Sequence, residues 1–175
     1  MNEVIKAMIE RRSCRKFKKD AVPRELIEQI VEAGLWAASG KGAQAPIMLV
    51  VTDPELRDRI AEANRKIGGW KEGFDPFYGA PVIIVVLSSK EVPTYVYDGS
   101  LTLGNLMLAA HSVGLGSIWI HRAKQEFETP EFRAILDDLG LEGEYEGIGH
   151  CAIGYPDIRL NRGAARKDDR VFWME

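Results

Sequence analysis

The feature that most constrains the fold is an uninterrupted run of aliphatic residues at Val82–Leu87, near the middle of the chain. Successive side chains of a strand point to opposite faces, so a strand formed by this run would be apolar on both faces. A strand of that kind must be covered on both sides by other layers of structure. We therefore expect a layered domain that contains this strand in its sheet.

Apolar spacing elsewhere in the chain predicts three more strands and five helices. Continuous apolar runs predict strands at 47–52, 116–120 and 148–153. Apolar residues at intervals of three or four predict helices at 2–11, 23–35, 54–66, 97–113 and 130–139. Because two helices come first and strands then alternate with helices, the order favours a mixed α+β arrangement over a regular doubly wound one. No internal repeat or linker divides the chain, so we expect residues 1–175 to form a single domain.

Charge and cysteine content argue against several classes of protein. A formal net charge of −3 argues against a general nucleic-acid binder, whose surface is broadly basic. No apolar run approaches the roughly 18 residues of a membrane span, and no signal peptide is visible. The two cysteines, Cys14 and Cys151, form neither a disulfide framework nor a metal-binding pattern. We therefore expect a cytoplasmic protein that binds neither nucleic acid nor membranes and that has no metal site.

A basic stretch at residues 11–19 contrasts with this acidic background. Six of its nine residues are arginine or lysine. Arginine presents forked donors that suit phosphate, and Ser13 adds a hydroxyl, so the stretch is a candidate site for a compact anion. The alternative is that these cations end a first helix, where they complement its dipole and otherwise lie in water. The stretch by itself leaves both interpretations open.

Three other segments suggest contacts beyond the core. Residues 36–46 form a loop of small residues, in which Gly40 and Gly42 would let a ligand approach the backbone, although a plain connecting loop is the alternative. Residues 68–81 combine four glycines with four aromatic rings, which favours partial cover of a pocket over a satellite cluster on the core. The chain ends in four apolar residues, Val171–Met174, that we expect to dock, for example on a partner subunit.

Four motifs, in order along the chain, resemble those of the FMN-dependent nitroreductase family. Arg11–Phe17 is similar to the RRSxRxF signature, and Ala38–Pro46 occupies the place of the PSxxNxQPW segment. Gly114–Ile120 resembles the GLGxxWI strand, and Ile153–Pro156 resembles the IGYP turn. One such motif would be weak evidence, but four in the family's order and spacing are specific.

The chain departs from the family pattern in the region expected near the flavin ring. Gly42 replaces the usual Asn, and the Pro-Trp pair is shifted to Ala45-Pro46. His121 replaces the Gly that often follows the WI pair. These departures concern the expected substrate pocket and leave the expected phosphate end unchanged.

The resemblance implies a three-layer nitroreductase-like fold, with a central mixed β-sheet flanked by helices, in an intertwined homodimer that binds FMN at the subunit interface. It further implies an enzyme in which NADH or NADPH reduces the flavin, which then passes electrons to a nitroaromatic, a quinone or a similar small-molecule acceptor. The cofactor carries the redox chemistry, so no catalytic side chain is expected. Three alternatives stay open: a flavin carrier or sensor without turnover, a dehalogenating or flavin-cleaving member of the superfamily, and a plain anion-binding module.

The resemblance also implies cofactor-binding roles for residues at matching positions. Arg11 and Arg15 would hold the FMN phosphate and the polar end of the flavin, with Arg12 and Ser13 as further donors. The remaining assignments are Ser39 and Gln44 from the facing loop across the dimer, Ile120, His121 and Arg122 close to flavin N5 and O4, and Arg166 and Lys167 from the tail at the phosphate.

Three other residues of reactive type are expected to serve packing, His111 in the core or at an interface. His111 lies within a predicted helix, and His150 and Cys151 lie within a predicted strand, with too few neighbouring ligand types for a metal site. Cys14 lies beside the candidate phosphate site, where cations would lower the pKa of its thiol and burial would raise it. No catalytic role is assigned to it.

Overall fold

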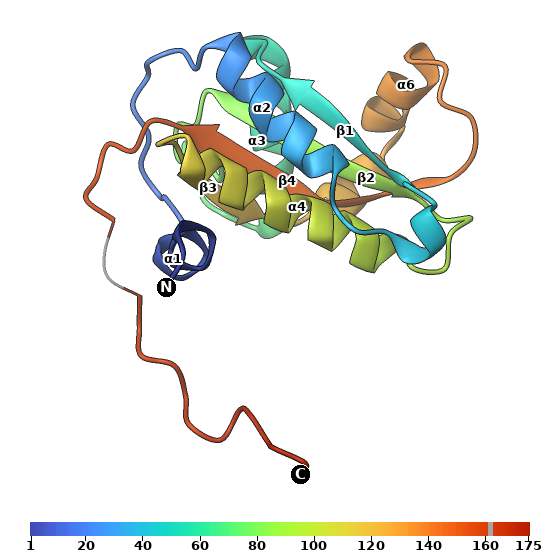
Figure 1. The fold of residues 1–175 in the computed structure, drawn as a ribbon. Helices are drawn as coiled ribbons and strands as arrows, with labels where there is room; N and C mark the ends of the chain where they lie inside the picture. The colour runs from blue at the N-terminus through green and yellow to red at the C-terminus, as the bar shows by residue number, and fades with distance from the viewer. Residues whose placement is uncertain (161–162) are drawn as a thin grey trace.

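The computed structural model describes residues 1–160 and 163–175, which fold into the arrangement of Figure 1. The strands are β1 (Pro46–Val51), β2 (Val82–Ser89), β3 (Gly116–Ile120) and β4 (Tyr145–Gly154). The helices are α1 (Glu3–Glu10), α2 (Arg24–Leu35), the 3-10 turn η1 (Gly40–Gly42), α3 (Pro54–Gly68), α4 (Tyr95–Ser112), α5 (Ala123–Phe127) and α6 (Pro130–Asp138).

The four strands form one sheet in the order β1-β2-β4-β3, and each is antiparallel to its neighbours. β2 lies between β1 and β4, and every residue of β2 except the last is buried. A mixed sheet was expected, and the four strands themselves contain no parallel pair. Among the described residues, the parallel pairing is an isolated bridge between Ser13 and Ser117 at the start of β3.

Alternate residues of β2 belong to two hydrophobic clusters, one for each face of the sheet. Ile83 and Val85 pack with buried residues of α3, α5 and α6. Ile84 and Val86 pack with buried residues of α2 and α4, which Figure 1 shows across one face of the sheet. Burying each such side chain contributes about 1.5–3 kcal/mol. The predicted three-layer α+β fold is therefore confirmed, and the reason is the two-faced apolar strand at its centre.

The helix α5 was not predicted from the sequence. It has five residues, too few to repeat the apolar spacing that identifies a helix. Its backbone instead packs closely on β4, because a Cβ on Gly147 would lie 2.3 Å from backbone atoms of Ala123. Gly147 is therefore required for this close approach. All five helices that were predicted are present, with their ends shifted by a few residues.

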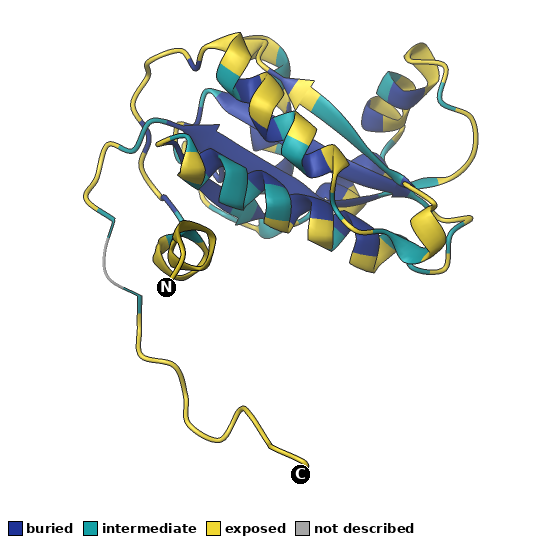
Figure 2. Cartoon of the chain, in the orientation of Figure 1, coloured by how far each residue is buried: buried dark blue, intermediate teal, exposed yellow. Residues whose placement is uncertain are grey.

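The two ends of the chain leave apolar side chains uncovered (Figure 2). The helix α1 has no buried residue, and Val4, Met8 and Ile9 are each more than half exposed. At the other end, the side chains of Val171–Met174 are 69–96% exposed, so within one chain this segment does not dock as expected. None of the described helices is both long and apolar enough to cross a membrane.

Candidate ligand-binding site

The basic stretch leaves α1 and runs beside the paired ends of β3 and β4. Cys14 N donates to Ser117 O at 2.9 Å, and Lys18 N donates to Tyr155 O at 2.8 Å. Cys14 and Phe17 are buried under the stretch. These contacts fix the backbone of the stretch on the sheet, while most of its cationic side chains remain at the surface.

Two guanidinium groups at the start of this stretch have unpaired donors. Arg11 Nη1 and Arg12 Nε are both buried, and neither has a hydrogen-bond partner among the described residues. Arg12 Nη1 donates to Ile9 O and Arg11 O, each at 2.6 Å, so its position is held by the local backbone. An unpaired buried donor costs about 1–3 kcal/mol, and more when it is charged. These two donors are therefore candidates to bind an anionic acceptor.

Lys16 and the two cysteines do not hydrogen-bond to the unpaired donors of Arg11 and Arg12. Lys16 is paired with Asp157, with 2.8 Å between Lys16 Nζ and Asp157 Oδ2, and this pair holds the pKa of the Asp157 carboxyl below its usual value. Burial raises the pKa of the Cys14 thiol and raises that of Cys151 to about 12. Both cysteines are therefore protonated at neutral pH and contribute no reactive thiolate.

The opposite end of β3 presents a second group of expected site residues. Ile120 is buried, His121 is exposed, and Arg122 is half-buried with a φ of 85°, which is unusual for a residue other than glycine. The guanidinium of Arg122 lies over the ring of Trp70, 4.4 Å from its centroid. Trp70 belongs to the aromatic segment 68–81, so that segment holds a residue at the end of β3.

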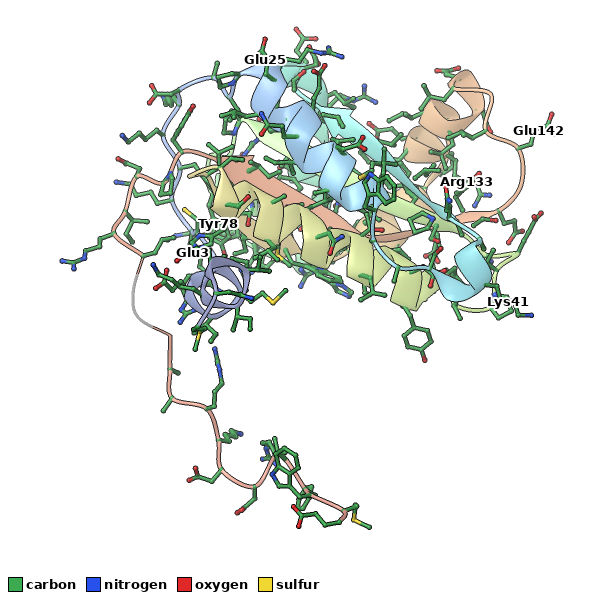
Figure 3. All side chains as sticks on the ribbon, in the orientation of Figure 1. Glu3, Glu25, Lys41, Tyr78, Arg133 and Glu142 are labelled. Carbon is green, nitrogen blue, oxygen red and sulfur yellow. The ribbon has the colours of Figure 1, made fainter. Side chains whose placement is uncertain are left out.

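The small-residue loop between α2 and β1 lies elsewhere. Ser39 Oγ accepts from Gln44 N at 3.0 Å, and Gly40 N donates to Asp98 Oδ1 at 3.0 Å, which ties the loop to α4. In Figure 3, Lys41 of this loop and Glu3 of α1 lie at opposite ends of the molecule. Within one chain, this loop is therefore apart from the basic stretch.

The structure brings the expected residues together in two groups and leaves others apart. Arg11, Arg12, Ser13 and Arg15 lie beside the start of β3, and Ile120, His121 and Arg122 lie at its end. His121 lies four residues after Ser117, a distance of about 13 Å along an extended strand. Ser39 and Gln44 are in the distant loop. Arg166 and Lys167 are exposed in the tail, three and four residues after Gly163, which packs on the Arg12 guanidinium.

Three buried polar residues lie under the end of β3, and sequence reasoning missed two of them. Asn64, Glu126 and His150 are each 0% exposed and are joined by hydrogen bonds. His150 was expected to be a packing residue, and Asn64 and Glu126 were not considered. They come from α3, α5 and β4, so no local pattern in the sequence connects them.

Comparison with known proteins identifies the family. A model described as the nitroreductase family matches residues 8–68 and 69–155, which is most of the chain. The chain belongs to the nitroreductase family. The resemblance inferred from the four sequence motifs is thereby confirmed.

Solved structures and other relatives share this family's fold. A nitroreductase with bound FMN from Bacteroides fragilis has a TM-score of 0.87 and 27% identity, with both chains covered completely. An FMN-bound nitroreductase from Desulfitobacterium hafniense has a TM-score of 0.88 and 26% identity, again over both whole chains. An iodotyrosine deiodinase from Thermotoga neapolitana is 29% identical over 165 residues, covering 84% of this chain and 85% of that protein.

One further relative has a higher sequence identity over a shorter aligned region. A Methanothermobacter thermautotrophicus protein, provisionally named NADH dehydrogenase/NAD(P)H nitroreductase, is 34% identical over 121 residues. The aligned region covers 67% of this nitroreductase-family chain and 60% of that protein. The family and the fold are thus established.

Proposed function

We propose that this chain is an FMN-dependent oxidoreductase, with residues 1–175 forming a single FMN-binding domain. The observation that carries the proposal is the pair of buried, unpaired donors, Arg11 Nη1 and Arg12 Nε. A phosphate would supply the anionic acceptor that both atoms lack, and a charge-assisted hydrogen bond is worth about 1.5–3 kcal/mol. The FMN named for the Bacteroides fragilis and Desulfitobacterium hafniense structures carries such a phosphate.

The basic stretch would bind the phosphate end of FMN. Arg11 and Arg12 would donate their unpaired N–H groups, and Arg15 and the Ser13 hydroxyl would add donors from the same segment. Arg12 also ends α1, because its Nη1 donates to Ile9 O and Arg11 O. The unpaired Arg12 Nε and Arg11 Nη1 support the additional role in phosphate binding. Lys16 is already paired with Asp157, so we assign it no part in the site.

The end of β3 would face the flavin ring. Ile120, His121 and Arg122 would present backbone groups to the N5 and O4 edge, where amide donors stabilise negative charge. Bound FMN would accept a hydride from NADH or NADPH and pass electrons to a nitroaromatic, a quinone or a similar acceptor. The chain's own contribution is to bind and orient the cofactor and to tune its electrostatics.

A second copy of the chain would complete the site. Ser39 and Gln44 lie far from the basic stretch of their own chain, so they would reach the flavin of a partner subunit. Arg166 and Lys167 would contribute to the phosphate site from the tail. The uncovered apolar side chains of α1 and of 171–174 supply a surface that a homodimer would bury.

Absorbance spectroscopy of the purified protein, followed by anaerobic addition of NADH or NADPH, tests the proposal. We expect a bound flavin spectrum that bleaches on addition of the nicotinamide and recovers on addition of a quinone or nitroaromatic. A preparation that stays colourless with added FMN would overturn the proposal. A flavin spectrum that neither nicotinamide bleaches would instead support a carrier or sensor.

Reductive dehalogenation is a second candidate, favoured by the similarity to the Thermotoga neapolitana iodotyrosine deiodinase over 84% of this chain. The departures at Gly42 and His121 would also lie near the flavin ring, where a substrate would bind. Incubation of the reduced protein with iodotyrosine, with release of iodide as the readout, separates this activity from nitro or quinone reduction. Iodide release faster than reduction of the other acceptors would favour the deiodinase.

A further inference from the structure

The polar network under the end of β3 consists of Asn64, Glu126 and His150, all fully buried. His150 Nε2 lies 2.6 Å from Glu126 Oε2, and Asn64 Nδ2 donates to Glu126 Oε1 at 2.5 Å. The network also reaches the backbone, because His150 Nδ1 lies 3.1 Å from Ile120 O and Asn64 Nδ2 donates to His121 O at 2.8 Å. Three side chains from three elements therefore converge on two successive carbonyls.

The chemistry of these contacts determines where the hydrogens lie. A carbonyl oxygen only accepts, so His150 Nδ1 must carry the proton that it shares with Ile120 O. The two contacts of Asn64 Nδ2 are both to oxygen, so both amide hydrogens of Asn64 are used. One proton lies between His150 Nε2 and Glu126 Oε2, and the pair is neutral overall whichever atom holds it. This neutrality makes the burial of both groups tolerable.

The network controls the direction of two amides that face away from it. The chain contains no cis peptide bond among its described residues, and in a trans peptide the N–H points opposite to the preceding carbonyl. Holding Ile120 O and His121 O toward the interior therefore turns the N–H groups of His121 and Arg122 away from the network. The left-handed φ of Arg122 belongs to the same turn and requires support from its surroundings.

A purely structural role does not require this arrangement. A buried ionic network stabilises a fold little better than well-packed apolar residues of similar volume. The hydrogen bonds from the network to the backbone instead go to the carbonyls of the two peptide groups that contain His121 N and Arg122 N. Those amides lie at the end of β3 where the proposed flavin ring would be held.

We propose that Asn64, Glu126 and His150 are positioning residues that orient the His121 and Arg122 amides toward the flavin and thereby raise its reduction potential. The inference rests on the proposed function. Two-electron reduction raises the electron density on flavin O4, so amide donors directed at O4 would bind the reduced form more tightly than the oxidised form. None of the three residues would touch the cofactor.

The test compares the reduction potential of bound FMN, by spectroelectrochemistry, in the wild-type protein and in Asn64→Leu. The substitution keeps a side chain of similar size but removes both donors, so His121 O is released. We expect binding of reduced FMN to weaken at least tenfold relative to oxidised FMN. For a two-electron couple this corresponds to a potential lower by about 30 mV.

Two variants serve as controls. Ile60→Ala removes a buried apolar side chain one turn earlier on the same helix, and it should lower stability while leaving the potential unchanged. Glu126→Gln can still accept from Asn64 and donate to neutral His150, so it should retain most of the wild-type potential. If Asn64→Leu does not fold, Asn64→Val is measured in its place, because its smaller apolar side chain also lacks both donors.

Each outcome decides between distinct conclusions. A lowered potential in the Asn64 variant alone supports the positioning role. An unchanged potential, or an equal fall in Ile60→Ala, overturns the inference and leaves the proposed FMN-dependent function intact. Failure of the wild-type protein to bind FMN overturns both.

Discussion

The two ends of β3 differ in how completely one chain satisfies its polar groups. At the far end, the Asn64–Glu126–His150 network supplies partners for the backbone carbonyls of Ile120 and His121 from within the same chain, and its neutral Asn64 Oδ1 is buried without a partner among the described residues. At the near end, buried donors of two arginines have no partner among the described residues, and the adjacent helix α1 is exposed.

This contrast separates the part of the site that the chain builds alone from the part that requires other molecules. The buried end is held by packing and by a neutral hydrogen-bonded network, so it should form in the monomer without a ligand. Under the proposed function, the basic end would gain its missing partner from an anion, and α1 would gain its missing cover from a second copy. The predictions below test whether the two ends respond differently to substitution.

The largest expected effect is on the buried end. His150→Phe removes the contacts to Ile120 O and Glu126, and leaves the Glu126 carboxylate buried with only Asn64 as a donor. We expect the free energy of unfolding of the ligand-free protein to fall by about 3–5 kcal/mol. Urea unfolding measures the change. A loss below 1 kcal/mol would show that the network does not hold this region.

The second prediction concerns the exposed helix next to the basic end. Met8→Glu replaces an apolar side chain, 57% exposed in the single chain, with one that carries a carboxylate. If α1 is buried in a homodimer, the charge would have no partner there and should weaken dimerisation by about 3 kcal/mol or more. Monomer stability should change by less than about 0.5 kcal/mol. Light scattering measured as a function of protein concentration reports the change in dimerisation, and urea unfolding reports the change in monomer stability. Lys6→Glu, in the same helix, is the matched surface control.

The third prediction addresses the arginines themselves. Arg15→Ala should weaken FMN binding by about 1.5–3 kcal/mol, the value of a charge-assisted hydrogen bond. Arg11→Ala should weaken it to a similar degree while leaving the ligand-free protein equally or more stable, because it removes an unpaired buried donor. Fluorescence titration with FMN and thermal unfolding measure these effects. Unchanged FMN affinity would remove the substituted arginine from the site.

The smallest expected effect concerns the Lys16–Asp157 pair, which we place outside the ligand site. Lys16 lowers the pKa of Asp157 in the folded state, so the contribution of this pair is present above the ordinary aspartate pKa. It is lost as the pH falls through the lowered folded pKa. Asp157→Asn should therefore slightly reduce stability at pH 7 and weaken its dependence on pH below about 4. A marked fall in FMN affinity would show that the pair belongs to the site.

Much of the fold could be predicted from local sequence, whereas the roles of the candidate site residues stay predictions. The apolar spacing identified all four strands and five of the helices, and four ordered motifs identified the family. The five-residue helix α5 was missed because it is too short to show a period. Predictions about the tail and the loop at Ser39 and Gln44 concern a partner subunit and stay predictions.

What the sequence determined by itself is the pattern of burial and the order of the motifs. Both are local properties, since a strand such as Val82–Leu87 shows its two apolar faces in consecutive residues. Only the tertiary structure decided that Asn64, Glu126 and His150 meet under one strand end and that Arg11 and Arg12 have unpaired donors. Such contacts depend on the packing of segments far apart in the chain, because a hydrogen bond requires atoms within about 3 Å, whatever their separation in sequence.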